Sequence, residues 1–138
     1  MPTLLVRTNV PADGESANML VPFAPGGVPG TDWIKGPRDL DVSLKASAAV
    51  AELVGKPEKF VMVLVEAGAT MSFGGTHEPA AFLQLISLGK IGGEIKKGIT
   101  RALSDLMAEA FGVPADRLYL HFIDPARSDF GWNGTTFG

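Results

Sequence analysis

Two stretches of the chain carry apolar residues at the helical period. From Glu94 to Phe111 the apolar positions recur every three or four residues, which predicts a helix with one buried face that Gly112 ends. A second helix is predicted to run to Val54, with Asp39 or Asp41 as its N-cap.

Four strands are predicted where Leu, Val, Ile and aromatic residues cluster between turn residues. They are Thr3–Val10, Lys59–Glu66, Ala81–Leu88 and Arg117–Ile123. The order is strand, helix, strand, repeated once, and a Gly-x-Pro triplet joins each helix to its following strand. Each unit should be a right-handed crossover between parallel strands. The sequence therefore predicts an α+β fold of two β-α-β units, with a four-stranded mixed sheet and both helices on one face.

The first unit is longer than the second between its strand and its helix. The extra residues, near 12–36, are rich in proline and glycine, which cannot continue a helix or a central strand. We therefore expect a single domain over residues 1–138 with an insertion at about 12–36.

The second predicted strand has apolar residues on both faces, which is typical of a strand buried on both sides. Two helices cover only one face of the sheet, so the other face must meet another surface. Copies of the same chain are the most economical partner, and we predict a homo-oligomer. The alternating residues are Phe60, Met62 and Leu64 on one side and Val61, Val63 and Val65 on the other.

Composition and charge exclude several classes of function. Of the 138 residues, 46% are hydrophobic and 20% charged, as in globular proteins. A net charge of −3 provides no basic surface for nucleic acid or anionic lipid, and no apolar run is long enough to cross a membrane. The lack of cysteine excludes disulfides and thiol catalysis. No signal peptide is recognised, so we expect a cytoplasmic protein, with non-classical secretion as the alternative.

The N-terminus carries the main candidate chemistry. Removal of Met1 before the small Pro2 would leave a secondary amine at the start of a strand. An α-amino group has a reference pKa of about 8, and burial or a nearby cation lowers it. A neutral amine is a good general base, although Met-Pro is also a common way for a chain to begin.

The predicted topology brings further groups to the same edge of the sheet. Pro2 and Lys56 each precede one of two parallel strands, and Ser87-Leu88 ends the antiparallel neighbour. Lys56 could bind an anionic substrate, or be a solvated lysine at a helix C-terminus. The glycine-rich segment 89–93 before the second helix could bind an anion or form only a tight turn.

Several segments resemble macrophage migration inhibitory factor and its plant and microbial relatives, in the tautomerase superfamily. The segments are MPTLLVRTNVP, GKPEKFVMV, MSFGGTHEPAA, SLGKIGG, GVPADRLYLHFID and GWNGTTFG, and they cover the chain except near 12–36. The resemblance implies a homotrimer and a keto–enol tautomerase of phenylpyruvate-like or dopachrome-like compounds that needs no cofactor.

The resemblance also implies roles for individual residues. Pro2 corresponds to the catalytic acid/base and Lys56 to the lysine that binds the substrate carboxylate. Leu88 would bind substrate through its backbone amide. The neighbouring subunit would supply Tyr119. An apolar wall corresponds to Phe130, Trp132 and Phe137.

Two positions depart from animal members of the family. Phe60 stands where they have a rim tyrosine, and His121 stands where they have asparagine. Histidine changes its charge near neutral pH, so His121 is a substrate-binding candidate that would make the pocket sensitive to pH; the alternative is a neutral histidine hydrogen-bonded within the sheet. Tyr119 and Trp132 could equally be core or interface aromatics. The alternative function is a cytokine-like protein that binds a receptor or other partner the sequence does not specify.

Overall fold

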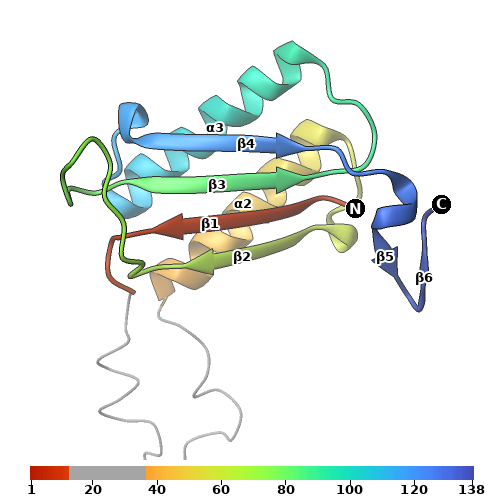
Figure 1. Cartoon of the computed structure of the whole chain (residues 1–138), viewed down its shortest axis with the longest axis horizontal. Helices are drawn as coiled ribbons and strands as arrows, with labels where there is room; N and C mark the ends of the chain where they lie inside the picture. The colour runs from red at the N-terminus through yellow and green to blue at the C-terminus, as the bar shows by residue number, and fades with distance from the viewer. Residues whose placement is uncertain (13–36) are drawn as a thin grey trace, which may run out of the picture.

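The computed structural model describes residues 1–12 and 37–138 of the chain. A four-stranded sheet forms one layer, and helices pack across one of its faces (Figure 1). The chain begins with strand β1 (Thr3–Thr8), and the other elements follow in sequence. They are α2 (Pro37–Val54), β2 (Met62–Glu66), β3 (Ala81–Ile86), α3 (Gly93–Phe111), β4 (Leu118–Ile123), β5 (Gly131–Trp132) and β6 (Thr135–Thr136), with 3-10 turns η1 (Glu58–Phe60), η2 (Ala115–Arg117) and η3 (Arg127–Asp129).

The sheet has the predicted mixed topology. Its strand order is β2-β1-β3-β4, with β1 parallel to β2, β3 parallel to β4, and the two central strands antiparallel. Each β-α-β unit therefore forms one half of the sheet, and the predicted α+β arrangement is confirmed.

Both helices end at a glycine in the left-handed conformation, as the repeat suggested. Gly55 has φ 77° and Gly112 has φ 67°, where a residue with a side chain would be strained. Their N–H groups donate to Ala51 O and Ala108 O, and so satisfy carbonyls at the helix ends.

The hydrophobic core lies between the two helices and the facing side of the sheet. Alternate residues of the central strands point into it, including Leu4, Val6, Leu83 and Leu85. The helices contribute Val42, Ala46, Val50, Ile99, Leu103, Met107 and Phe111. Neither helix in the described part of the chain has the length and apolar character needed to cross a membrane.

Several predicted boundaries were wrong. The first helix begins at Pro37, so Asp39 lies in its first turn and Asp41 beyond it, and neither is the N-cap. Proline is well suited to a first helical turn because its missing N–H has no helical acceptor there. The first strand ends at Thr8 and the third at Ile86. The second and fourth begin later than predicted, because η1 and η2 occupy their first residues.

The second strand is not buried on both faces within one chain. It lies at the edge of the sheet, with the side chains of Met62 and Leu64 65% and 46% exposed. Val63 and Val65, on the other face, pack against the core. The apolar pattern therefore reflects one covered face and one open face.

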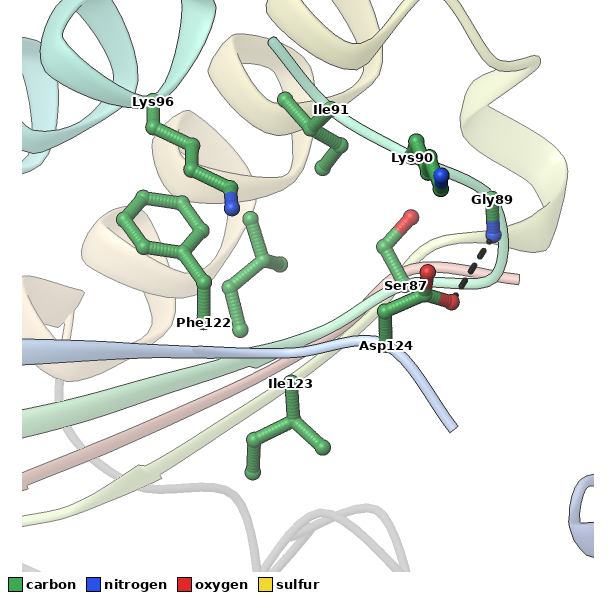
Figure 2. A pocket seen from close by; sticks show the side chains of 9 residues that line it. Ser87, Gly89, Lys90, Ile91, Lys96, Phe122, Ile123 and Asp124 are labelled. Atoms are coloured by element: carbon green, nitrogen blue, oxygen red, sulfur yellow. Dashed lines mark hydrogen bonds between the residues drawn. The ribbon is translucent and has the colours of Figure 1, made fainter. Parts of the chain in front are cut away.

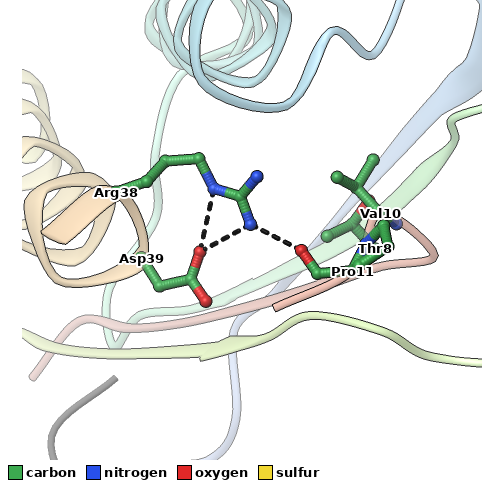
Figure 3. Close-up of polar contacts among 5 residues, drawn as sticks. All are labelled: Thr8, Val10, Pro11, Arg38 and Asp39. Carbon is green, nitrogen blue, oxygen red and sulfur yellow. Dashed lines mark hydrogen bonds and ion pairs between the residues drawn. The ribbon is translucent and has the colours of Figure 1, made fainter. Parts of the chain in front are cut away.

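The predicted insertion, 12–36, lies outside the described residues except for its first position. Arg38 donates from Nη2 to the carbonyl of Pro11, at 2.6 Å, and forms an ion pair with Asp39 at 3.0 Å (Figure 3). The residues on either side of the segment therefore meet at the end of β1 that is far from Pro2 (Figure 1).

Candidate active site

The sheet holds the N-terminal residues at the edge that the topology predicted. The Pro2 side chain is fully buried, and its carbonyl accepts a hydrogen bond from Met62 N at 3.0 Å. The next residue, Thr3, is opposite Met62 on one side and Ile86 on the other. The N-terminus is therefore fixed between the start of β2 and the end of β3.

A pocket of about 220 Å³ opens beside this edge. Four of the predicted site residues line it together: Pro2, Lys56, Leu88 and Phe137. Met1, Pro57, Phe60 and Arg127 complete the lining. The structure therefore places a candidate base, a cation and an apolar wall around one cavity.

The end of helix α2 positions Lys56. After the left-handed Gly55, the Lys56 N–H donates to Ala51 O at 3.1 Å, which turns the chain back toward the sheet. Pro57 follows at once, so the backbone at this corner has little conformational freedom. Lys56 itself is exposed at the mouth of the pocket.

The electrostatics of the pocket favour a neutral N-terminal amine. Burial, the largest cause, lowers the pKa of the Met1 amine below its usual value of 8.0. The positive charges of Lys56 and Arg127 lower it further, because both disfavour a third positive charge nearby.

The chain just after β3 lines this pocket between two anchored residues. Ser87 N donates to Ile123 O and Gly89 N to Asp124 Oδ1, whereas Leu88 N–H has no acceptor among the described residues. Leu88 is 5% exposed and lines the pocket between these two anchored neighbours.

The C-terminal segment supplies the aromatic wall. Trp132 stacks on Phe137 at 6.2 Å between ring centroids and meets Phe60 edge-on at 5.8 Å. The ring centroids of Phe130 and Phe137 are 6.1 Å apart. The hairpin β5–β6, formed around Asn133 and Gly134 with positive φ, holds Trp132 in place.

Arg127 is the site residue that sequence reasoning missed. Its Nε donates to Phe137 O at 3.1 Å, so it fixes the chain end while its charge faces the amine. The predicted strands and helices did not include it, because the last predicted strand ended at Ile123 and the course of the chain through η3 was needed to place Arg127 at the pocket edge.

Tyr119 and His121 do not reach this pocket within one chain. Tyr119 is opposite Phe82, near the start of β3, whereas the pocket lies beyond the end of β3 at Ile86. At roughly 3.3 Å per residue, Phe82 and Ile86 are about 13 Å apart along the strand. Both side chains are exposed on the open face of the sheet, and Tyr119 packs on Phe73 at 5.1 Å between centroids. Their supply by a neighbouring subunit stays a prediction.

Two β-α-β units with an N-terminal proline beside a lysine at the sheet edge are the architecture of the tautomerase superfamily. The family model described as macrophage migration inhibitory factor (MIF) matches residues 36–138. The chain belongs to the macrophage migration inhibitory factor family.

Relatives match over the whole chain. A macrophage migration inhibitory factor homolog of Trichuris trichiura is 34% identical over 137 residues, covering 99% of this chain and 100% of that protein. The Xenopus laevis macrophage migration inhibitory factor is 31% identical, covering 99% of each.

Solved structures agree with the fold. The homologue from Prochlorococcus marinus superposes with a TM-score of 0.78 at 28% identity, covering 99% of each chain. The factor from Trichinella spiralis gives 0.72 at 30% identity, with 98% of this chain and 99% of that one covered.

Proposed function

We propose that the protein is a keto–enol tautomerase whose catalytic acid/base is the amine of Pro2. The observation that carries the proposal is the pocket in which Pro2, Lys56 and Arg127 meet. Burial, Lys56 and Arg127 lower the pKa of the Met1 amine at this edge, and we expect the same causes to act on the Pro2 amine once Met1 is removed, which favours the neutral form that can accept a proton.

The reaction requires only a proton transfer. In a 2-keto acid, the Pro2 nitrogen takes a proton from the carbon next to the carbonyl, and the electron pair of that C–H bond forms the C=C bond. The carbonyl oxygen then takes a proton from the protonated amine and becomes the enol hydroxyl. Atoms and charge balance without a cofactor.

The pocket favours a small anionic substrate with an apolar end. Lys56 and Arg127 would bind the carboxylate, and the unpaired N–H of Leu88 would donate to a substrate oxygen. The rings of Phe137 and Trp132 would hold an aromatic group. Phenylpyruvate-like and dopachrome-like compounds have this combination of groups.

We further propose that the active form is a homotrimer that completes the site. The open face of the sheet exposes Met62, Leu64 and Tyr119, each by 46% or more. Association would cover these side chains and bring Tyr119 and His121 of one subunit to the Pro2 pocket of the next.

Phenylpyruvate turnover tests the proposal. Protein with a free Pro2 should show turnover, and a Pro2→Gly variant that keeps the same circular dichroism spectrum and melting temperature should lose about 10²-fold or more in kcat/KM. A folded protein whose Pro2→Gly variant is equally active would exclude the mechanism. A folded protein with no turnover would favour the partner-binding alternative.

A further inference from the structure

A second pocket, of about 230 Å³, lies on the helix side of the sheet. It sits where the ends of β3 and β4 meet the first turn of α3, as Figure 2 shows. Residues 89–91 close its upper side in Figure 2, and Leu85 and Phe122, which are opposite each other in the sheet, also line it.

Ser87 gives the first indication of a ligand. The alternation of β3 directs residues 81, 83 and 85 toward the helices, and Ser87 follows the same side. Its side chain is 2% exposed, and its Oγ has no hydrogen-bond partner among the described residues. A buried hydroxyl without a partner is costly. Figure 2 shows this hydroxyl directed into the pocket, where a bound acceptor would satisfy it.

Lys96 gives the second indication. It lies in the first turn of α3 and is half-buried, and its Nζ reaches into the pocket 5.7 Å from the centroid of the Phe122 ring. The ion pairs found in the described part of the chain do not include it. A half-buried ammonium without a carboxylate partner favours a bound anion.

The remaining polar groups leave the pocket positive. Lys90 lies at its rim, and Gly92 and Gly93 open the N-terminus of α3, whose dipole also favours an anion. Asp124 is the acidic residue of the lining, and its Oδ1 already accepts the Gly89 N–H at 3.1 Å.

We propose that this pocket binds a small organic anion. Its carboxylate would lie between the Lys96 ammonium and the Ser87 hydroxyl, with both groups donating to it. Its apolar body would pack on Leu85, Ile91 and Phe122, which an inorganic anion would leave unused.

The site is separate from the Pro2 pocket but shares a wall with it. Leu88 lines the Pro2 pocket, whereas its neighbours Ser87 and Gly89 line this one. The proposed organic anion therefore does not occupy the Pro2 pocket. Its binding can be measured directly, without an assay of tautomerase turnover.

Benzoate is a suitable probe, with benzamide as its neutral counterpart. The titration follows backbone amide resonances by two-dimensional NMR in the Lys56→Gln variant, which weakens anion binding in the Pro2 pocket. We expect saturable shifts at Ser87, Gly89 and Ile91 with benzoate, and at least about fivefold weaker binding of benzamide.

The matched test and control are Lys96→Gln and Lys97→Gln. Each is added to the Lys56→Gln variant, and benzoate binding is compared between them. Lys97 is adjacent in sequence but exposed and paired with Glu94 at 3.6 Å. The Lys96 change should weaken benzoate at least about fivefold, the loss of one charge-assisted hydrogen bond, and the Lys97 change should leave it unaltered. Ser87→Ala should also weaken benzoate, without lowering the melting temperature.

Three results would overturn the site. They are equal effects of the two lysine changes, benzamide binding as tightly as benzoate, and shifts confined to Phe60, Arg127 and Phe137, which line the Pro2 pocket. The last result would place benzoate in the Pro2 pocket alone.

Discussion

Lys56 and Arg127 place two positive charges beside the N-terminal amine. Both lower the pKa of that amine, after burial as the larger cause, and both can bind an anionic substrate. Removing either charge should therefore change the strength of the base and the affinity for substrate together.

Lys56→Gln should move the acidic limb of the kcat/KM profile to higher pH. Lys56 lowers the pKa of the amine, so its loss raises that pKa, and a higher pH is then needed to free the base. KM for a carboxylate substrate should rise about 10-fold, the usual loss for a hydrogen bond to a charged group.

Lys45→Gln is the control for this experiment. Lys45 is exposed on α2 and pairs with Asp41 at 3.0 Å, away from the pocket. The pH profile of kcat/KM for the Lys45→Gln variant should match that of the unaltered protein. If the Lys56 profile also matched, Lys56 would be only a solvated residue at the end of a helix.

The elements differ in how far the sequence predicts them. Helix ends were predictable because Gly55 and Gly112 are needed where φ is positive. The repeat predicted two parallel strand pairs running in opposite directions, and that arrangement brings Pro2, Lys56 and Leu88 together.

Strand starts were less predictable. The run from Lys59 is apolar and β-branched, but Phe60 N and Val61 N bond back to Pro57 O and Glu58 O and form a 3-10 turn first. Asn133-Gly134, a strong hairpin signal, was present in the sequence, although the four-strand prediction left β5 and β6 out. Arg127 required knowledge of where the chain runs after β4.

Removal of residues 13–35, with the ends joined by a short Gly-Ser linker, should leave a folded and active protein. These residues lie outside the described structure, but their flanks meet through Arg38 and Pro11 at the end of β1 that is far from Pro2. Shortening a loop changes its closure free energy by only about 0.6 kcal/mol per halving of length.

Melting temperature and kcat/KM of the shortened protein test this expectation. Both should stay close to those of the full chain. A shortened protein that folds but does not turn over substrate would show that the segment builds part of a site.

The whole molecule exposes an apolar sheet face that a single chain does not cover. Met62, Leu64 and Tyr119 lie on it, and exposed apolar patches of this kind mark contact surfaces. The fold of one chain does not define the assembly, because Tyr119, which would complete the Pro2 pocket, lies toward the opposite end of the sheet within the same chain.

Light scattering should give a mass near three times 14.5 kDa. Leu64→Arg should reduce that mass to one chain and abolish turnover, because it introduces a charge into the proposed contact. A stable monomer of the unaltered protein would contradict the trimer and the shared site. Leu44→Arg, an exposed change on α2, is the control and should leave the trimer intact.

The central claim is that a free Pro2 amine is the acid/base, and the state of the N-terminus tests it most directly. Two preparations of the same chain, one processed to Pro2 and one retaining Met1, differ by that residue and therefore in whether the proline nitrogen is an amine or an amide. An amide nitrogen cannot take the proton, so the Met1 form should lose about 10²- to 10⁴-fold in kcat/KM at an unchanged melting temperature. Equal turnover by the two preparations would contradict the account.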